Sequence, residues 1–259
     1  MRVSTAQNHQ STLFQDHHFS SPGKMALYPL YGKQKLIFYY NVVSTTLWFC
    51  CLCRFLILLP LVGRKFLPAG IADFFHVVSV FPLIGWVLVT ALVKTQHSWN
   101  DLWGLFDALR MVWMCYGVIF PHPKIAKHTS YSFLISSWCI QNLIDSFYHG
   151  FKTKTRTSPL WLFWLHHHHF YLTFFVSCVS EMILIFLSLG FVKSELHEWV
   201  LKACILAYVP VGYFLFGYLR NRQATKYDAF MEKRNRGRVQ NQELPRVQQP
   251  SSAVDQSSR

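Results

Sequence analysis

Glu181 is the side chain in this sequence best suited to acid–base chemistry. It is the lone carboxylate in the long apolar segment 160–190, where four consecutive histidines, His166–His169, precede it. An ionisable group at membrane depth is costly and is therefore either paired or functional. Four residues fall on the same helical stripe as Glu181: His167, Phe170, Phe174 and Ser177.

The stripe around Glu181 leaves two roles open for this residue. Ser177 lies one helical turn earlier, so we expect its hydroxyl to hydrogen-bond the carboxylate, and we expect the phenylalanines to line an apolar channel. A carboxyl group in such a channel is suited to general acid–base catalysis. The alternative is structural: a protonated Glu181 that takes a hydrogen bond from a neighbouring helix.

The histidine run suggests a metal site, but helix geometry argues against one. Successive residues on a helix turn by about 100°, so only His166 and His169 share a face. Two ligands are too few for a metal. The other histidines form none of the separated HxxxH and HxxHH boxes that integral-membrane di-iron desaturases and hydroxylases carry. We therefore predict neither a metal nor a cofactor.

The composition indicates a polytopic membrane protein. Of its 259 residues, 52% are hydrophobic and only 14% are charged. A helix that crosses a bilayer needs roughly 20 mostly apolar residues. Six segments meet this requirement, at about 36–61, 71–93, 102–121, 129–149, 160–190 and 199–219. We predict an all-α membrane protein with six transmembrane helices in one bundle.

The charged residues lie mainly outside these segments. We expect residues 1–35 to be a disordered N-terminus, 36–219 the membrane domain and 220–259 a basic, disordered tail. Lys and Arg are more frequent in the termini and in the loops on their side, so both termini are predicted to be cytosolic. The net charge of +13 does not indicate nucleic acid, because the basic residues lack interleaved aromatic residues.

Two further groups of residues are expected to be structural. Asp107 and Arg110 are spaced to form a local ion pair on one helix. The seven cysteines all fall within predicted spans, which favours packing over disulfides.

Five segments of the sequence carry a further pattern in a fixed order. They are LIFYYNVVS (36–44), DFFH (73–76), SFLISSWCIQNLIDSFY (132–148), FYLTFFVSCVSE (170–181) and AYVPVGYFLFGYLRNR (207–222). Together they resemble the very-long-chain 3-hydroxyacyl-CoA dehydratases, also called protein tyrosine phosphatase-like proteins. The resemblance implies a multi-pass, six-span protein of the endoplasmic reticulum membrane that acts in fatty acid elongation.

The resemblance also implies a site. The family's catalytic pair is a tyrosine and a glutamate on the fifth helix; Glu181 matches the glutamate, but Phe174 stands at the tyrosine position and has no hydroxyl. Tyr171, one turn earlier, is the nearest substitute on that helix. Ser177, Tyr148 and Trp138 are the candidate substrate-binding residues.

A second departure from the family's pattern involves the fourth helix. There Asn142 and Asp145 stand where the family has glutamate and arginine, and His166 and His167 replace an arginine–tyrosine pair. Asp145 and His166 lie at similar distances from the loop that joins their helices. We therefore expect Asp145 to pair with His166 or His167.

Three functions follow from these observations. The first is a divergent dehydratase that converts a long-chain or polyketide-like 3-hydroxyacyl thioester to the trans-2-enoyl product. The second is a non-catalytic relative that serves as a membrane scaffold or lipid-binding partner of elongation enzymes. The third is a membrane protein with another chemistry or a transport role.

The resemblance implies partners as well. They are an acyl-CoA or other acyl thioester, membrane lipid, and the condensing enzyme, ketoacyl reductase and enoyl reductase of elongation. The basic residues Lys152, Lys154 and Arg156 are expected to hold coenzyme A phosphates or anionic lipid headgroups.

Overall fold

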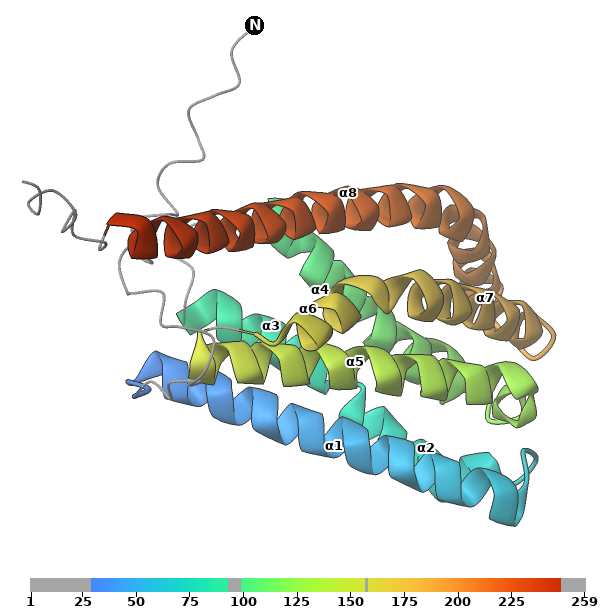
Figure 1. The fold of residues 1–259 in the computed structure, drawn as a ribbon. Helices are drawn as coiled ribbons and strands as arrows, with labels where there is room; N and C mark the ends of the chain where they lie inside the picture. Colours follow the sequence, from blue (N-terminus) through green and yellow to red (C-terminus); the bar gives the residue numbers. More distant parts are fainter. Residues whose placement is uncertain (1–28, 93–98, 157, 248–259) are drawn as a thin grey trace, which may run out of the picture. The chain divides into compact units, whose positions relative to one another are not determined.

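The computed structural model describes residues 29–92, 99–156 and 158–247, and across these ranges every regular element is a helix (Figure 1). The predicted all-α fold is therefore confirmed. Among the described residues, those up to Gln223 form one compact unit, and the part of the chain from Ala224 on belongs to a second unit. The interactions that build the site all lie within the first unit.

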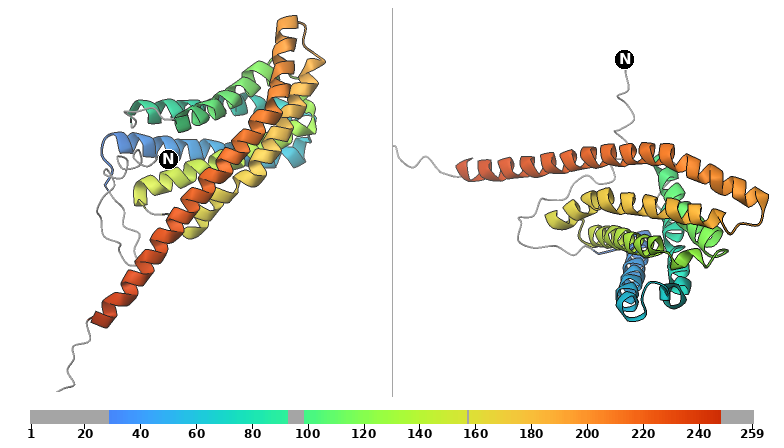
Figure 2. Two further views of the ribbon diagram at one scale, coloured as in Figure 1. Left: turned by 90° about the horizontal axis from the view of Figure 1, so that it is seen from above. Right: turned by 90° about the vertical axis from the view of Figure 1, so that its right-hand side faces the viewer.

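The elements follow the predicted apolar segments closely. The first half of the chain forms α1 (Lys33–Val62), α2 (Leu67–Val78), α3 (Phe81–Leu92), α4 (Trp99–Val112) and the π-helix η1 (Trp113–Ile119). The second half forms the short 3₁₀ helix η2 (Ile125–Lys127), α5 (Thr129–Thr155), α6 (Leu160–His168), α7 (Phe170–Leu189) and α8 (Glu195–Val247). Figure 2 shows α6 and α7 following one another almost without interruption.

The apolar core contains buried side chains from most of these helices. α1 packs along α5 and α2, and α5 packs in turn along α7 (Figure 1). At the centre, Phe75 of α2 stacks on Trp138 of α5, with ring centroids 5.7 Å apart, and Trp48 of α1 meets Phe75 edge-on. These three rings are fully buried. Aromatic pairs of this kind stabilise a core beyond the area that they bury, and they fix Trp138 in the orientation that the site uses.

Four helical stretches are long and apolar enough to cross a membrane. They are Lys33–Val62, Leu67–Ala91, Leu160–Leu189 and Glu195–Glu232. The predicted segments 102–121 and 129–149 are helical too, as α4 with η1 and as α5. The structure thus agrees with a helical membrane protein. The count of six spans and the cytosolic placement of both termini stay predictions.

The C-terminal segment differs from the sequence-based expectation. Residues 220–247 were expected to belong to a disordered tail, but α8 continues to Val247. Residues 224–247 are rich in good helix formers such as Ala, Met, Glu, Lys, Arg and Gln. They also place charges one turn apart, as in the Arg236–Glu232 pair at 2.5 Å. Residues 248–259, and 1–28 of the predicted N-terminus, lie outside the described residues.

A close approach between α1 and α3 provides a test of this packing. The Tyr40 hydroxyl donates to the Phe81 carbonyl oxygen at 2.7 Å, and it lies 2.2 Å from where a Cβ at Gly85 would be. Gly85→Ala should therefore displace Tyr40 and lower the free energy of unfolding by about 1–3 kcal/mol. Thermal unfolding of the detergent-solubilised chain measures this loss.

Gly212→Ala is the matched control, because a Cβ there meets no atom within 4 Å. If both variants unfold at the same temperature, Tyr40 does not pack closely against Gly85.

Candidate active site

Glu181 lies at a buried meeting point of four helices. Its side chain, on α7, has no exposed surface. Its carboxylate accepts a hydrogen bond from the Trp138 indole N–H of α5 at 3.1 Å and one from the Tyr208 hydroxyl of α8. The Arg110 guanidinium of α4 lies 3.1 and 3.2 Å from its two oxygens. Glu181 is therefore the acceptor for three donors from three other helices.

Arg110 connects this centre to a second carboxylate. Its guanidinium also lies 2.8 Å from Asp107 on the same helix, so the predicted local ion pair is confirmed. The pair with Glu181 was missed, because helix spacing reveals contacts within a helix but not across helices. Arg110 is buried, whereas the Asp107 side chain is 38% exposed. The buried charge of Arg110 is thus balanced mainly by Glu181, and a buried charge requires such a partner.

The predicted neighbours of Glu181 on α7 have other partners. The Ser177 hydroxyl donates to the Phe174 carbonyl oxygen at 3.0 Å, so the expected hydrogen bond to Glu181 is wrong. The Phe174 ring stacks on Phe216 of α8, with centroids 6.1 Å apart, and Phe170 contacts the same ring. The phenylalanine stripe therefore packs against α8 instead of lining a channel.

Tyr171 does not reach Glu181. Its ring is 41% exposed, and its hydroxyl donates to the Gln223 side chain at 2.9 Å. The helical step from Tyr171 to Glu181 also covers about 15 Å. The tyrosine hydroxyl at the site belongs instead to Tyr208, which the sequence reasoning missed. The sequence does contain a signal for Tyr208: it lies within an apolar span, and a buried tyrosine hydroxyl there needs a hydrogen-bond partner.

Tyr148 and Asp145 belong to a different polar cluster. The Tyr148 ring stacks on His166, with centroids 3.9 Å apart and planes 8° from parallel. Asp145 Oδ1 lies 2.8 Å from His166 Nδ1, so the expected pairing of Asp145 with His166 is confirmed. His167 turns away and contacts the Phe163 carbonyl oxygen. Because Trp138 and Tyr148 are about 15 Å apart along α5, Tyr148 is not a neighbour of Glu181.

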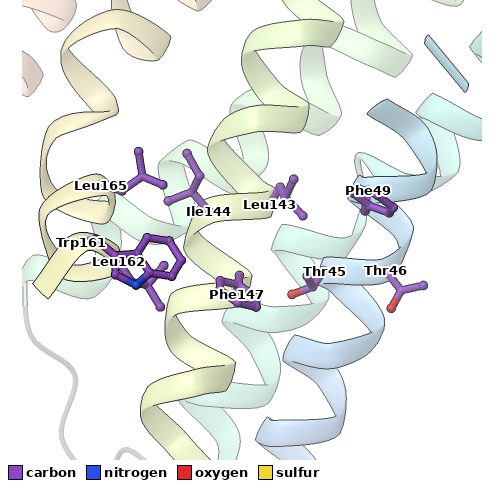
Figure 3. A pocket seen from close by; sticks show the side chains of 9 residues that line it. All are labelled: Thr45, Thr46, Phe49, Leu143, Ile144, Phe147, Trp161, Leu162 and Leu165. Atoms are coloured by element: carbon purple, nitrogen blue, oxygen red, sulfur yellow. The ribbon is translucent and has the colours of Figure 1, made fainter. Parts of the chain in front are cut away.

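A separate apolar cavity of about 420 Å³ lies between α1, α5 and α6 (Figure 3). Two threonines, Thr45 and Thr46, are its only lining residues with a side-chain oxygen, while leucine, isoleucine and aromatic side chains form the rest. Its lining holds no residue that could exchange a proton at neutral pH. Its lining is thus apolar and suited to a hydrocarbon chain.

Comparison with known proteins finds a family model that covers the site residues. Residues 105–228 match the family model of the protein tyrosine phosphatase-like proteins, PTPLA. This stretch contains Arg110, Trp138, Glu181 and Tyr208. This stretch, just under half of the chain, is thus similar to that family, which supports the resemblance that the sequence motifs indicated.

Among curated proteins, the chain is similar to very-long-chain (3R)-3-hydroxyacyl-CoA dehydratases of plants. PASTICCINO 2 of Arabidopsis thaliana is 30% identical over 88 residues, which are 34% of this chain and 40% of that protein. PASTICCINO 2A of Oryza sativa subsp. japonica is 26% identical over 84 residues, 32% of this chain and 38% of that protein. The matches thus span about two fifths of these relatives. No solved structure matches this chain.

The charge balance at Glu181 predicts a specific pattern of stabilities. Arg110→Met leaves the Glu181 carboxylate buried without its counter-ion and should destabilise the chain by about 3–5 kcal/mol. Adding Glu181→Gln removes the unpaired charge and should restore a large part of this loss. Thermal unfolding of the two variants in detergent measures both changes.

Asp107→Asn is the control on the same guanidinium. Its side chain is partly exposed, so the change should cost less than about 1 kcal/mol. Should Asp107→Asn destabilise as much as Arg110→Met, the principal partner of Arg110 would be Asp107 and not Glu181.

Proposed function

We propose that this chain is a membrane-embedded dehydratase of 3-hydroxyacyl-CoA substrates with a modified active site. The family match and the names of the plant relatives support this class of hydro-lyase. The observation that carries the proposal is the contact between the Tyr208 hydroxyl and the Glu181 carboxylate. It brings together a tyrosine and a glutamate, although Phe174 occupies the position at which the family resemblance places the tyrosine.

The proposed reaction needs one base and one acid. Glu181 takes the acidic hydrogen beside the thioester carbonyl as a proton, and the electron pair forms the new C=C bond. The Tyr208 hydroxyl gives its proton to the leaving hydroxyl, which departs as water. The proton on Glu181 then passes to the tyrosine oxygen through their hydrogen bond, which restores both groups.

The remaining residues of the site have positioning roles in this scheme. The Trp138 N–H donates to one Glu181 carboxylate oxygen at 3.1 Å and holds it in place. Arg110 stabilises the negative charge, whether Glu181 or Tyr208 carries it. Tyr208 thus replaces Tyr171 as the proposed partner of Glu181. Ser177 and Tyr148, which contact other groups, are not part of the proposed proton transfer.

The proposed setting is the endoplasmic reticulum membrane, in fatty acid elongation or a related lipid pathway. The substrate is a long-chain 3-hydroxyacyl thioester, and the product is the trans-2-enoyl thioester. Lys152 and Lys154 lie in the last turn of α5, and Arg156 caps this helix. We assign these charges to the coenzyme A phosphates or to anionic lipid headgroups. The other elongation enzymes are proposed partners.

One observation favours a second candidate, a non-catalytic scaffold. Glu181 is fully buried, and its carboxylate already has three partners that also link four helices. Such a network would hold a membrane bundle together without any substrate. In this role the chain would bind elongation enzymes or lipid.

A dehydration assay distinguishes the two candidates. Purified full-length chain is given a long-chain 3-hydroxyacyl-CoA, and the trans-2-enoyl-CoA product is measured by mass spectrometry. Glu181→Gln should reduce activity to background, because the glutamine amide cannot take up the proton. Tyr208→Phe should reduce it by about 10²–10⁴-fold, the usual contribution of a general acid.

Tyr213→Phe is the matched control on α8, where the ring is 77% exposed; its activity should equal that of the wild type. Tyr171→Phe should have little effect. A wild type without activity, together with activity gained in Phe174→Tyr, would contradict the dehydratase proposal and support the scaffold.

A further inference from the structure

Asp145 of α5, His166 of α6 and His169 at the start of α7 bring three metal-ligating atoms together. These atoms lie within 4.8 Å of one another. Asp145 Oδ1 is 2.8 Å from His166 Nδ1 and 3.6 Å from His169 Nε2. We propose that this cluster binds a divalent transition metal ion, with Zn²⁺ as the first candidate.

The distances fit a common centre. Zn²⁺ binds histidine nitrogen and carboxylate oxygen at about 2.0–2.2 Å, so the ligand atoms of a tetrahedral site lie about 3.3–3.6 Å apart. Of the two separations from Asp145, 2.8 Å is shorter than this range and 3.6 Å lies at its upper limit. The two histidine nitrogens lie within 4.8 Å of each other, so rotations of the Asp145 and histidine side chains would bring all three donors to one ion.

The orientation of His169 favours a cation in front of it. Its Nδ1 lies 3.2 Å from the Leu165 carbonyl oxygen, which can only accept a hydrogen bond, so Nδ1 carries the proton. In the neutral ring, Nε2 then presents a lone pair towards the Asp145 carboxylate. Two acceptors at this distance repel each other unless a cation lies between them. An N–H to backbone carbonyl contact of this kind is also the usual way in which a metal-binding histidine is oriented.

The His166 ring is held in place, but its Nδ1 atom lacks a hydrogen bond of good geometry to Asp145. Tyr148 stacks on its ring at 3.9 Å, which fixes the ring plane. Despite their short separation, His166 Nδ1 and Asp145 Oδ1 are buried atoms whose contact does not have the geometry of a hydrogen bond. Buried polar atoms of this kind require a partner, and one ion bound by both would supply it.

Helix periodicity alone argued against a metal because the third ligand, Asp145, comes from a different helix. His166 and His169 share a face, as predicted, and Asp145 comes from the neighbouring α5. Two histidines and one carboxylate leave a fourth position on Zn²⁺ for water or another ligand, which is the pattern of a reactive site and not of a closed structural one. Because Glu181 and Arg110 are not involved, the inference stands independently of the proposed dehydratase activity.

A proton is the competing occupant. Protonated His166 and His169 would form ordinary ion pairs with Asp145 and would need no metal. The two cases differ in two observables: only the metal site gives visible d–d absorption with Co²⁺ and a thermal stabilisation by Zn²⁺ that EDTA reverses.

The test uses the full-length chain in detergent, purified without a polyhistidine tag and freed of metal with a chelator. Titration with CoCl₂ should give d–d bands that saturate at about one ion per chain. Asp145→Asn and His169→Gln should each weaken binding by more than about 100-fold, since loss of an orienting partner alone costs about 10–100-fold.

His168→Gln is the matched control, because it lies in the same histidine run but contacts the Trp164 carbonyl oxygen; its affinity should equal that of the wild type. Unchanged affinity in Asp145→Asn would mean that the histidine run binds metal on its own, and would overturn the proposal. Absence of Co²⁺ bands in the wild type, with no stabilisation by Zn²⁺, would overturn it as well. Thermal stabilisation by Zn²⁺ is measured on the wild type, so this test remains valid even if a variant does not fold.

Discussion

The ion pair between Glu181 and Arg110 is the interaction on which the arrangement of the other helices depends. Both side chains are buried, and removing two charges from water costs several kcal/mol per ion unless attraction and hydrogen bonds compensate. The two charges therefore determine where α4 and α7 meet. The Trp138 and Tyr208 donors complete the compensation and bring α5 and α8 to the same point.

The surrounding structure is consistent with this constraint. Arg110 lies near the end of α4, and the chain then continues as the π-helix η1. Such segments are often found next to functional sites. Trp138 is fixed from its other side by the stack on Phe75, so its N–H is already oriented. The carboxylate thus has donors whose positions the apolar core sets, an arrangement suited to catalysis as well as to structure.

Two polar centres within the membrane segments differ in their chemistry. Around Glu181, one carboxylate faces an arginine, an indole and a phenol, which suits proton transfer. Around Asp145, one carboxylate faces two imidazole rings, which suits metal binding. Each centre contains one carboxylate, and the groups around that carboxylate decide its chemistry. The membrane explains why each one has partners at all, since an unpaired charge there is too costly to keep.

The sequence by itself determined the helical membrane class, the positions of most helices, the need of Glu181 for polar partners and the pairing of Asp145 with His166. Each depends on hydrophobic length or on helical periodicity, which act within one segment or across one short loop. Only the tertiary structure decided that Arg110 and Tyr208 meet Glu181, that Tyr171 lies away from it, and that Asp145 joins His169 as well. Periodicity defines the faces of each helix, but it does not say which faces of distant helices meet. That depends on how all the helices pack to bury their charges and aromatic rings together.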